Sequence, residues 1–196
     1  MHPELISLCL FMFVTSCSPG PNNIVASYSG FNFGILKTIP HMFGVIFGFT
    51  SLVAIMNFGL VNVFQKYPII QEILKYTGSL FLIYLAYKIS FSKSTSKNSK
   101  KNPVKFIETY FFQFINPKSV IVAVIMVSTY VERGQDFLFY SFWVIGVAFL
   151  FAIISINFWT LLGKFLRRFA TNEKFIKRFN YVMSFLLLTC IATFYL

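Results

Sequence analysis

A run of proline, glycine and polar residues interrupts the first apolar segment of this sequence, which covers about residues 5–28. The run consists of Ser18, Pro19, Gly20, Pro21, Asn22 and Asn23. Proline removes a backbone donor and breaks a helix, and a bilayer tolerates irregular backbone only within protein or around a wet cavity. Broken helices in transporters present N–H groups to carboxylates and carbonyl groups to ammonium groups or ions. We therefore predict that this run lines a solute path; a simple kink or an interfacial loop is the alternative.

A second break lies about a third of the way into a later apolar segment, at about residues 106–131. It contains Gln113, Asn116, Pro117 and Lys118. A lysine within the bilayer is costly unless it lines a cavity or reaches the interface. We predict that these residues line the same path and that Lys118 neutralises a substrate carboxylate or acts as a gate. Snorkelling of Lys118 to the interface is the alternative.

Two glycines and two asparagines in other apolar segments are further candidates. Glycines spaced by four residues let helices approach closely, so we expect Gly44 and Gly48 chiefly to pack, with a place on the path as the alternative. Asn57 and Asn157 could hydrogen-bond between helices or line the path, and both interpretations stay open.

Titratable residues in the apolar segments are few. Carriers that are coupled to protons usually need such a group near the substrate site. Glu108, near the start of the segment at 106–131, is our candidate for proton coupling, with a solvated position as the alternative. His41 titrates near neutral pH, but we expect it at the membrane interface.

The cysteines Cys9, Cys17 and Cys190 all lie in apolar segments, and the sequence has no CxxC motif and no cluster of Cys and His with ligand spacing. Disulfides and metal sites therefore have little support. We expect small apolar fillers, no metal site and no cofactor.

The composition is that of a membrane protein. The 196 residues are 57% hydrophobic and only 12% charged, whereas about 25% of the residues of a soluble domain are charged. The mean hydropathy is +0.71. Because a span needs about 20 residues, we predict an all-α integral membrane protein with six transmembrane helices in one domain, residues 1–196. The six apolar segments are 5–28, 38–61, 69–91, 106–131, 137–163 and 178–196.

The distribution of Lys and Arg predicts the orientation. The net charge is +11, and most of the 17 Lys and Arg residues lie in the loops after the first, third and fifth segments. Because short basic loops stay in the cytoplasm, we predict a multi-pass protein of the bacterial inner membrane with both termini outside. Retention of these loops also explains the positive charge, so we expect the lipid bilayer and no nucleic acid as a partner.

The six segments divide into two halves of three, at about 1–91 and 106–196, joined by a basic cytoplasmic loop at 92–105. The first segment of each half has a proline break, and the second has an asparagine before an aromatic residue, at Asn57 and Asn157. Gly44 and Gly146 also lie at similar offsets. Since an odd number of spans reverses the orientation of the second copy, these features favour two inverted three-helix repeats.

Four motifs in this order resemble the LysE/RhtB family of bacterial amino-acid exporters. They are Ser18-Pro19-Gly20-Pro21-Asn22, Gly44-x-x-x-Gly48, Tyr84-Leu85-Ala86-Tyr87-Lys88 and Phe112-Gln113-Phe114-Ile115-Asn116-Pro117-Lys118. The likeness in motifs covers about residues 5–131, and beyond it rests on hydropathy. The combination of the first and last motifs at this separation is fairly specific, whereas either alone is not.

The resemblance implies six spans and export of amino acids or their derivatives across the inner membrane, with coupling to the proton gradient. Homoserine and threonine exporters of the family commonly have an aspartate directly after the second glycine of GxxxG, where this chain has Phe49. That difference resembles the cysteine/O-acetylserine exporter branch. It favours a small neutral substrate such as cysteine or O-acetylserine, while homoserine, threonine and lysine stay open, and it weakens any proton coupling borrowed from that aspartate.

We therefore expect a transporter that works by alternating access, with an amino-acid-like solute bound near the two breaks, and no enzymatic activity. A homodimer stays open. One alternative is a transmembrane thiol-redox protein, because Cys17 precedes the first break, but the other cysteines lack a matching place. A cation exporter of similar architecture is disfavoured by the lack of acidic or Cys/His ligands in the spans, and a scaffold would have no use for two matching breaks.

Overall fold

The computed structural model describes residues 3–91, 104–131, 136–192, 194 and 195. This part of the chain is helical, without strands, as the sequence predicts. The elements are α1 (Pro3–Cys17), α2 (Pro21–Phe33), α3 (Ile35–Ile55), the π-helical turn η1 (Met56–Leu60), α4 (Val61–Lys66), α5 (Ile69–Ser90), α6 (Phe106–Ile115), α7 (Pro117–Tyr130), α8 (Phe137–Leu166), the 3-10 turn η2 (Arg167–Phe169) and α9 (Glu173–Ala192). Most of the basic loop predicted at 92–105 lies outside the described residues.

Both predicted breaks separate two helices that meet at a sharp angle. The axes of α1 and α2 differ by 54°, and those of α6 and α7 by 61°. In each pair the second helix begins with proline, at Pro21 and at Pro117. Proline suits the first position of a helix because its missing N–H would have no intrahelical partner there.

The helices that are long and apolar enough to cross a membrane are fewer than the six predicted segments. Within the described residues three helical stretches qualify by length and composition, Ile35–Val63, Phe137–Phe169 and Glu173–Ala192, and up to five if each bent pair is one span. The third predicted segment, 69–91, forms the single helix α5. The last helix begins at Glu173 instead of about 178, because the side chain of Asn172 accepts a hydrogen bond from the backbone N–H of Phe175 at 2.8 Å and so caps the helix start.

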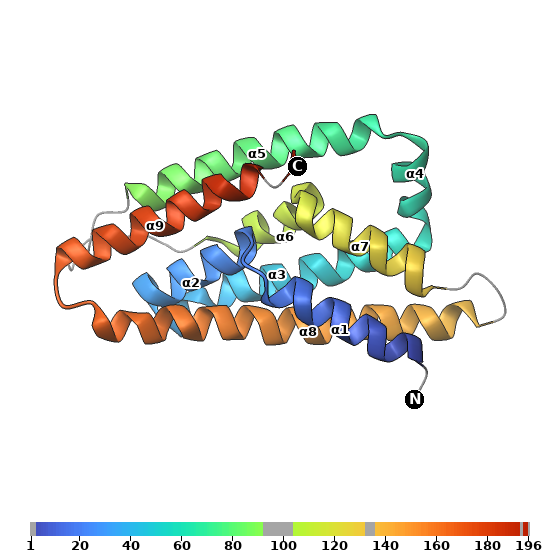
Figure 1. Ribbon diagram of the computed structural model, residues 1–196, viewed down its shortest axis with the longest axis horizontal. Coiled ribbons are helices and arrows are strands. Elements are labelled where there is room, and N and C mark those ends of the chain that lie inside the picture. Colours follow the sequence, from blue (N-terminus) through green and yellow to red (C-terminus); the bar gives the residue numbers. More distant parts are fainter. Residues whose placement is uncertain (1–2, 92–103, 132–135, 193, 196) are drawn as a thin grey trace.

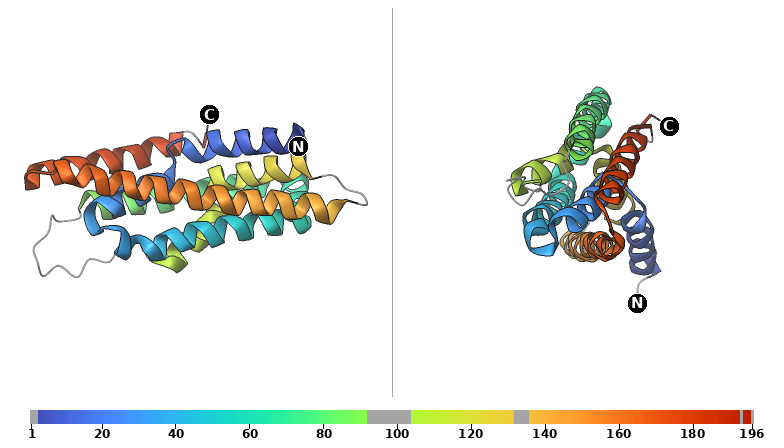
Figure 2. Two further views of the ribbon diagram at one scale, coloured as in Figure 1. Left: turned by 90° about the horizontal axis from the view of Figure 1, so that it is seen from below. Right: turned by 90° about the vertical axis from the view of Figure 1, so that its left-hand side faces the viewer.

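The helices form an elongated bundle in which α8 runs along one side and the α5–α9 pair lies on the other (Figures 1 and 2). Helices α2, α6 and α7 lie between them, whereas α1 lies beside α8 at the edge of the bundle (Figures 1 and 2). Helix α2 packs against α8, and α6 packs against α3. The α2–α3 and α8–α9 connections and the end of α5 lie at the same end of the bundle, on the left of Figure 1. The start of α1 lies at the opposite end.

Two apolar clusters form the interior. One joins α1, α3, α7 and α8 around Leu52, Met126 and Ile156, and the other joins α2, α5, α6 and α9 around Leu82 and Leu187. Many large apolar side chains instead face outward along α1, α3, α5, α8 and α9. A water-soluble protein rarely exposes apolar surface on this scale, so the outer surface fits lipid.

Glycines let the helices approach at two crossings. A Cβ atom on Gly44 or Gly48 would meet the backbone oxygen of Phe106 or Tyr110 at 2.7 Å, so α3 and α6 pack backbone to backbone. Gly30 on α2 and Gly163 on α8 do the same at their crossing. Gly146, which the sequence pairs with Gly44, has open space where a Cβ would point and makes no comparable crossing.

After α3 the chain leaves the direction of the bundle. The π-helical turn η1 contains Gly59 at φ 135°, a conformation that residues with a Cβ rarely adopt. The short helix α4 then runs across the end of the bundle to α5 (Figure 1). The second predicted segment, 38–61, therefore ends in a bend.

Candidate functional site

A cavity of about 80 Å³ opens between the two breaks. Since one water needs roughly 10–15 Å³ by this measure, the space holds several waters or a small solute. It is lined by Met12, Thr15, Ser16, Gly20, Pro21, Asn22, Asn23, Val45, Phe49, Asn116, Lys118, Ser119, Val122, Ala152, Ser155 and Ile156. Six residues that the sequence selects on the two breaks, almost 100 positions apart, thus share one cavity wall.

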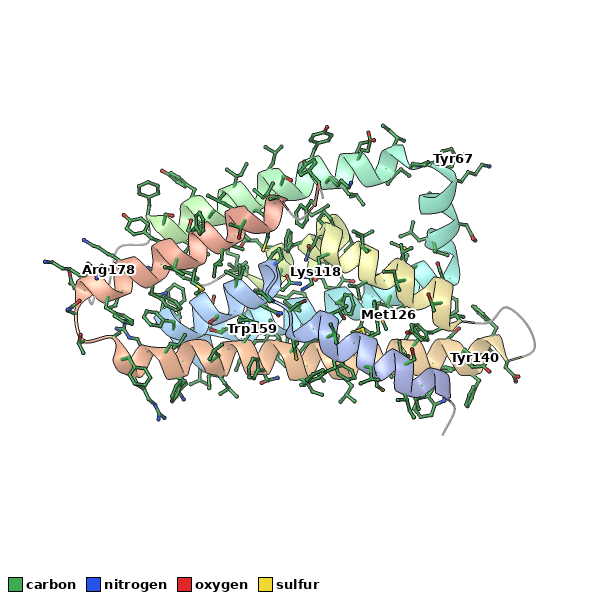
Figure 3. All side chains as sticks on the ribbon, viewed as in Figure 1. Tyr67, Lys118, Met126, Tyr140, Trp159 and Arg178 are labelled. Carbon is green, nitrogen blue, oxygen red and sulfur yellow. The ribbon has the colours of Figure 1, made fainter. Side chains whose placement is uncertain are left out.

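Lys118, in the first turn of α7, is the charged residue of the cavity lining, and its side chain lies near the middle of the bundle (Figure 3). Its Nζ donates to the backbone oxygen of Ser18 at 3.1 Å and to Ser18 Oγ at 2.7 Å. Ser18 follows the last turn of α1, where unpaired carbonyl groups attract a cation. Lys118 therefore bridges the two breaks.

No carboxylate neutralises Lys118 among the described residues. The ion pair found there joins Lys88 to Glu108 at 3.6 Å. The N-terminus of α2 adds positive potential beside Lys118, because its N-cap is Gly20, which has no side chain to accept from the free N–H groups. Gly20 is also the close neighbour of Lys118: a Cβ there would lie 3.0 Å from Nζ. The ammonium group of Lys118 and the positive end of the α2 dipole therefore lie side by side at the cavity.

Asn22 and Gln113 join the two halves through their amides. Asn22 Nδ2 donates to Gln113 Oε1 at 2.8 Å, and Gln113 Nε2 donates to Asn22 Oδ1 at 3.0 Å. Gln113 Oε1 also accepts from Ser119 Oγ at 3.0 Å, and Ser119 Oγ accepts from Asn116 Nδ2 at 2.9 Å. Asn116 itself caps α7, since its Oδ1 accepts from the backbone N–H of Lys118 at 3.2 Å.

Asn23 and Ser155 satisfy the carbonyl groups that the first break leaves free. Asn23 Nδ2 donates to the backbone oxygens of Ser16 and Ser18 at 2.9 and 3.1 Å. Ser155, on α8, lies within hydrogen-bonding distance of the Ser16 oxygen at 2.8 Å and of Asn23 Oδ1 at 3.2 Å. The polar groups of the break thus find partners in protein, as the bilayer demands.

The remaining residues selected from the sequence lie around the cavity rather than on it. Pro117 is buried next to the close approach of Gly78 on α5. Pro19 is exposed. Asn157 donates to the Ile153 oxygen of its own helix at 2.8 Å. Asn57 is buried in the π-helical turn, and neither polar atom of its amide has a partner within the described residues.

Sequence reasoning missed the hydroxyl residues of the cavity, Thr15, Ser16, Ser119 and Ser155. Ser155 had a usable signal, because it is a polar residue within the long apolar segment at 137–163. The others lie within four residues of a break and resemble ordinary helix residues. Val45 and Phe49 on α3 also line the cavity. Because both are apolar residues within an apolar segment, residue type alone does not indicate that they face a polar cavity.

The two titratable candidates both have partners within the protein. His41, which the sequence places near the start of its apolar segment, is 2% exposed and sits between α2, α3 and α6. Glu108 is half-buried at the start of α6, where its carboxylate accepts from the backbone N–H of Lys105 at 3.1 Å. Among the described residues no group of three or more His, Cys, Asp or Glu could hold a metal ion.

Comparison with known proteins gives a consistent picture. The family model for the LysE type translocator matches residues 13–195. The cysteine/O-acetylserine efflux protein of Salmonella typhimurium (strain LT2) is 28% identical over 195 residues, with 97% of each chain covered. The protein of the same name from Escherichia coli (strain K12) is 28% identical over 198 residues, also with 97% of each chain covered. No solved structure matches the chain.

Proposed function

Because this chain belongs to the family of LysE type translocators and is a membrane exporter of amino acids, not an enzyme, we propose that it exports a small neutral amino acid such as cysteine or O-acetylserine. Export would cross the bacterial inner membrane by alternating access. The observation that carries the proposal is Lys118, a cation that lines a central cavity and has no carboxylate partner within the described residues.

The solute carboxylate would bind at Lys118 and the N-terminus of α2. An ammonium group with two hydrogen bonds to Ser18 has a third N–H available. The free N–H groups in the first turn of α2 favour the same anion. A charge-assisted hydrogen bond contributes more than a neutral one, about 1.5–3 kcal/mol.

The ammonium group of the solute would find oxygen acceptors among the hydroxyl groups that α1 and α8 contribute to the cavity. Thr15 Oγ1 donates to the Phe11 oxygen at 2.9 Å, and Ser155 Oγ donates to the Ser16 oxygen at 2.8 Å. Each hydroxyl oxygen keeps lone pairs that can accept from a cation. The cavity therefore offers a cation to the carboxylate of a zwitterion and hydrogen-bond acceptors to its ammonium group.

The size and walls of the cavity favour a short side chain. The space of about 80 Å³ is lined in part by the apolar side chains of Val45, Phe49 and Ala152. The two efflux proteins compared above are named for cysteine and O-acetylserine. Homoserine and threonine are similar in size and stay as alternatives, whereas the long cationic side chain of lysine fits this space poorly.

We extend the proposal to six spans arranged as two inverted repeats, α1–α5 and α6–α9. Corresponding helices pair with each other in the bundle, α3 with α8 and α5 with α9. Each bent pair packs against the second helix of the other half, α1–α2 against α8 and α6–α7 against α3. These reciprocal contacts support a pseudo-two-fold relation, and rocking of the halves about the breaks would alternate access.

The proposed orientation has the basic end of the bundle in the cytoplasm and both termini outside. Lys37, Lys88, Lys164 and Arg167 lie at helix ends of the α2–α3, α5–α6 and α8–α9 connections, as the positive-inside rule requires. A homodimer stays an open alternative. A cation exporter is disfavoured by Lys118.

Exchange of labelled solute in proteoliposomes tests the proposal. Vesicles loaded with unlabelled cysteine under reducing conditions should take up labelled cysteine. Lys118→Gln should raise the solute concentration for half-maximal exchange roughly 10–100-fold, the equivalent of one charge-assisted hydrogen bond. Lys118→Arg, which keeps the charge, is the matched control and should raise this concentration less. Cysteamine, which lacks the carboxylate, should compete poorly with wild type.

The possible outcomes test the proposed substrate class and the role of Lys118 separately. Failure of folded wild type to exchange cysteine, O-acetylserine, homoserine or threonine would overturn the proposed substrate class. Exchange that is unchanged in Lys118→Gln would leave an exporter but remove Lys118 as the carboxylate site.

A further inference from the structure

His41 is a buried titratable group that the proposed binding of solute does not use. Its ring lies between three helices, with Nδ1 3.0 Å from Thr109 Oγ1 on α6 and Nε2 3.3 Å from the backbone oxygen of Asn22 on α2. It is buried from solvent. Both nitrogens of the ring therefore have partners, each on a different half of the chain.

The two partners fix which nitrogen can change its protonation. A backbone carbonyl only accepts, so Nε2 facing Asn22 must carry a hydrogen in both protonation states. A hydroxyl can donate or accept, so Nδ1 facing Thr109 can be bare or protonated. Nδ1 is therefore the atom at which His41 gains or loses a proton.

Thr109 is placed to serve both states. Its Oγ1 also lies 3.1 Å from the backbone oxygen of Lys105, one turn earlier on α6. When His41 is neutral, the Thr109 hydroxyl donates to Nδ1. When His41 is charged, Nδ1–H donates to Thr109 Oγ1, and the hydroxyl hydrogen turns to the Lys105 oxygen. That oxygen keeps its bond from the backbone N–H of Thr109 in either state. No heavy atom has to move, and no polar group is left without a partner.

His41 is linked to the cavity along two helices. On α3 it precedes Val45 and Phe49, which line the cavity, by one and two turns, so the three share a helix face. On α2 it binds the backbone of Asn22, whose side chain lines the cavity and pairs with Gln113. Gln113 Nε2 in turn donates to the Thr109 oxygen at 2.9 Å. A charge on His41 therefore develops directly behind the cavity wall.

The other charged groups on the elements around His41 are engaged elsewhere or lie at helix ends. Its own helix carries Lys37 near its start, and α8 carries Lys164 near its end. On α6, Glu108 pairs with Lys88 and caps the helix start at Lys105. On α7, Lys118 is bound to Ser18. The tyrosines of the packed helices are Tyr28, Tyr110, Tyr130 and Tyr140.

We propose that His41, through Nδ1, takes up and releases the proton that is exchanged for the exported solute. This inference rests on the proposed export function. It moves the coupling role from Glu108, where the sequence placed it, to the group that touches both halves of the chain. A unit charge in a medium of low dielectric interacts strongly with other charges, so a proton on His41 and the solute in the cavity would influence each other's binding.

Two transport modes in the same vesicles separate coupling from export. Exchange of labelled for unlabelled cysteine without a gradient needs binding and alternating access but no net proton movement. Net solute movement driven by an imposed pH gradient needs the coupled proton. His41→Gln, which can still hydrogen-bond but cannot become charged, should keep exchange and lose stimulation by the gradient. Glu108→Gln is the matched control and should keep both.

Each outcome of these two measurements either supports or overturns the inference about His41. His41→Gln that still responds to the gradient like wild type overturns the inference, as does wild type that exchanges solute but ignores the gradient; export stands in both cases. Wild type that shows neither mode removes the export function and the inference with it. Loss of gradient response in Glu108→Gln but not in His41→Gln returns the role to Glu108.

Nuclear magnetic resonance on the full chain keeps the test valid if His41→Gln does not fold. The chain has two histidines, so His2→Ala leaves a single ¹⁵N-labelled imidazole in lipid nanodiscs. We expect Nε2 to stay protonated and Nδ1 to titrate, with Thr109→Val shifting the titration and Glu108→Gln shifting it less. A ring that stays neutral from about pH 5 to pH 9, or that titrates at Nε2, would overturn the inference.

Discussion

The side-chain amides of Asn22 and Gln113 hydrogen-bond to each other in both directions, at 2.8 and 3.0 Å, across 91 residues of sequence. Asn22 belongs to the first turn of α2 and Gln113 to the last turns of α6, so the pair ties one broken helix to the other. Gln113 is fully buried. In a low dielectric, removal of either member leaves a polar group of the other without its partner, which is costly.

The amide pair gives a double-mutant prediction. Asn22→Leu or Gln113→Leu alone removes both hydrogen bonds of the pair and leaves the other amide without this partner, which costs about 1–3 kcal/mol of folding free energy. The loss should be smaller for Asn22→Leu, because Gln113 keeps its bonds to Ser119 and to the Thr109 oxygen. The double variant should be more stable than the sum of the two losses indicates, since it leaves no orphaned amide. Thermal unfolding in detergent measures all four proteins. Strictly additive losses would show that the two amides do not interact.

The close contact of α3 with α6 predicts the effect of adding a methyl group at Gly48. Gly48→Ala would place Cβ 2.7 Å from the Tyr110 oxygen and 2.8 Å from Gln113 Cγ. Overpacking of this kind costs about 1–3 kcal/mol. Gly146→Ala is the matched control, because its Cβ meets open space and alanine favours helix. Equal melting temperatures of the two variants would contradict this packing.

The cap of α7 predicts a difference between two substitutions of Asn116. Asn116→Ala removes the acceptor for the Lys118 N–H, which costs about 1 kcal/mol at a helix N-cap. Asn116→Ser keeps an oxygen that can cap the helix and should be closer to wild type. Melting temperature and solute exchange should fall together in the alanine variant, because the cap also positions Lys118. If alanine and serine behave alike, the cap does not matter.

The cysteines distinguish transport from thiol chemistry. Cys9, Cys17 and Cys190 form no disulfide within the described residues, and none of the three lines the cavity. A variant with all three replaced by serine or alanine should therefore retain exchange of labelled solute. Loss of exchange on Cys17→Ser alone, with folding intact, would favour the thiol-redox alternative.

The proposed orientation can be read from labelling. In the cysteine-free protein, Lys37→Cys lies at the basic end of the bundle and Tyr67→Cys at the other, and both native side chains are exposed. A membrane-impermeant maleimide added to intact spheroplasts should modify the cysteine at 67 and spare the one at 37. The reverse pattern would place both termini in the cytoplasm.

The sequence by itself determined the class of the protein and the place of its breaks. Sparse charge and long apolar segments exclude a soluble fold whatever the arrangement of the helices. Proline acts on its own turn of helix, so Pro21 and Pro117 could be assigned to breaks from local chemistry, and the structure bends at both. The family resemblance rested on the same motifs and is confirmed. The six spans and the inverted repeats stay predictions.

Only the tertiary structure decided which residues meet. A helix exposes every face in turn, and the sequence does not set how two helices are rotated against each other. Lys118 could therefore not be assigned to Ser18, nor Ser155 to Asn23, although each residue was visible as polar. His41 shows the limit most clearly: its position in the sequence did not indicate Asn22 or Thr109, whereas packing of α2 and α6 against α3 buries it between these two hydrogen-bond partners.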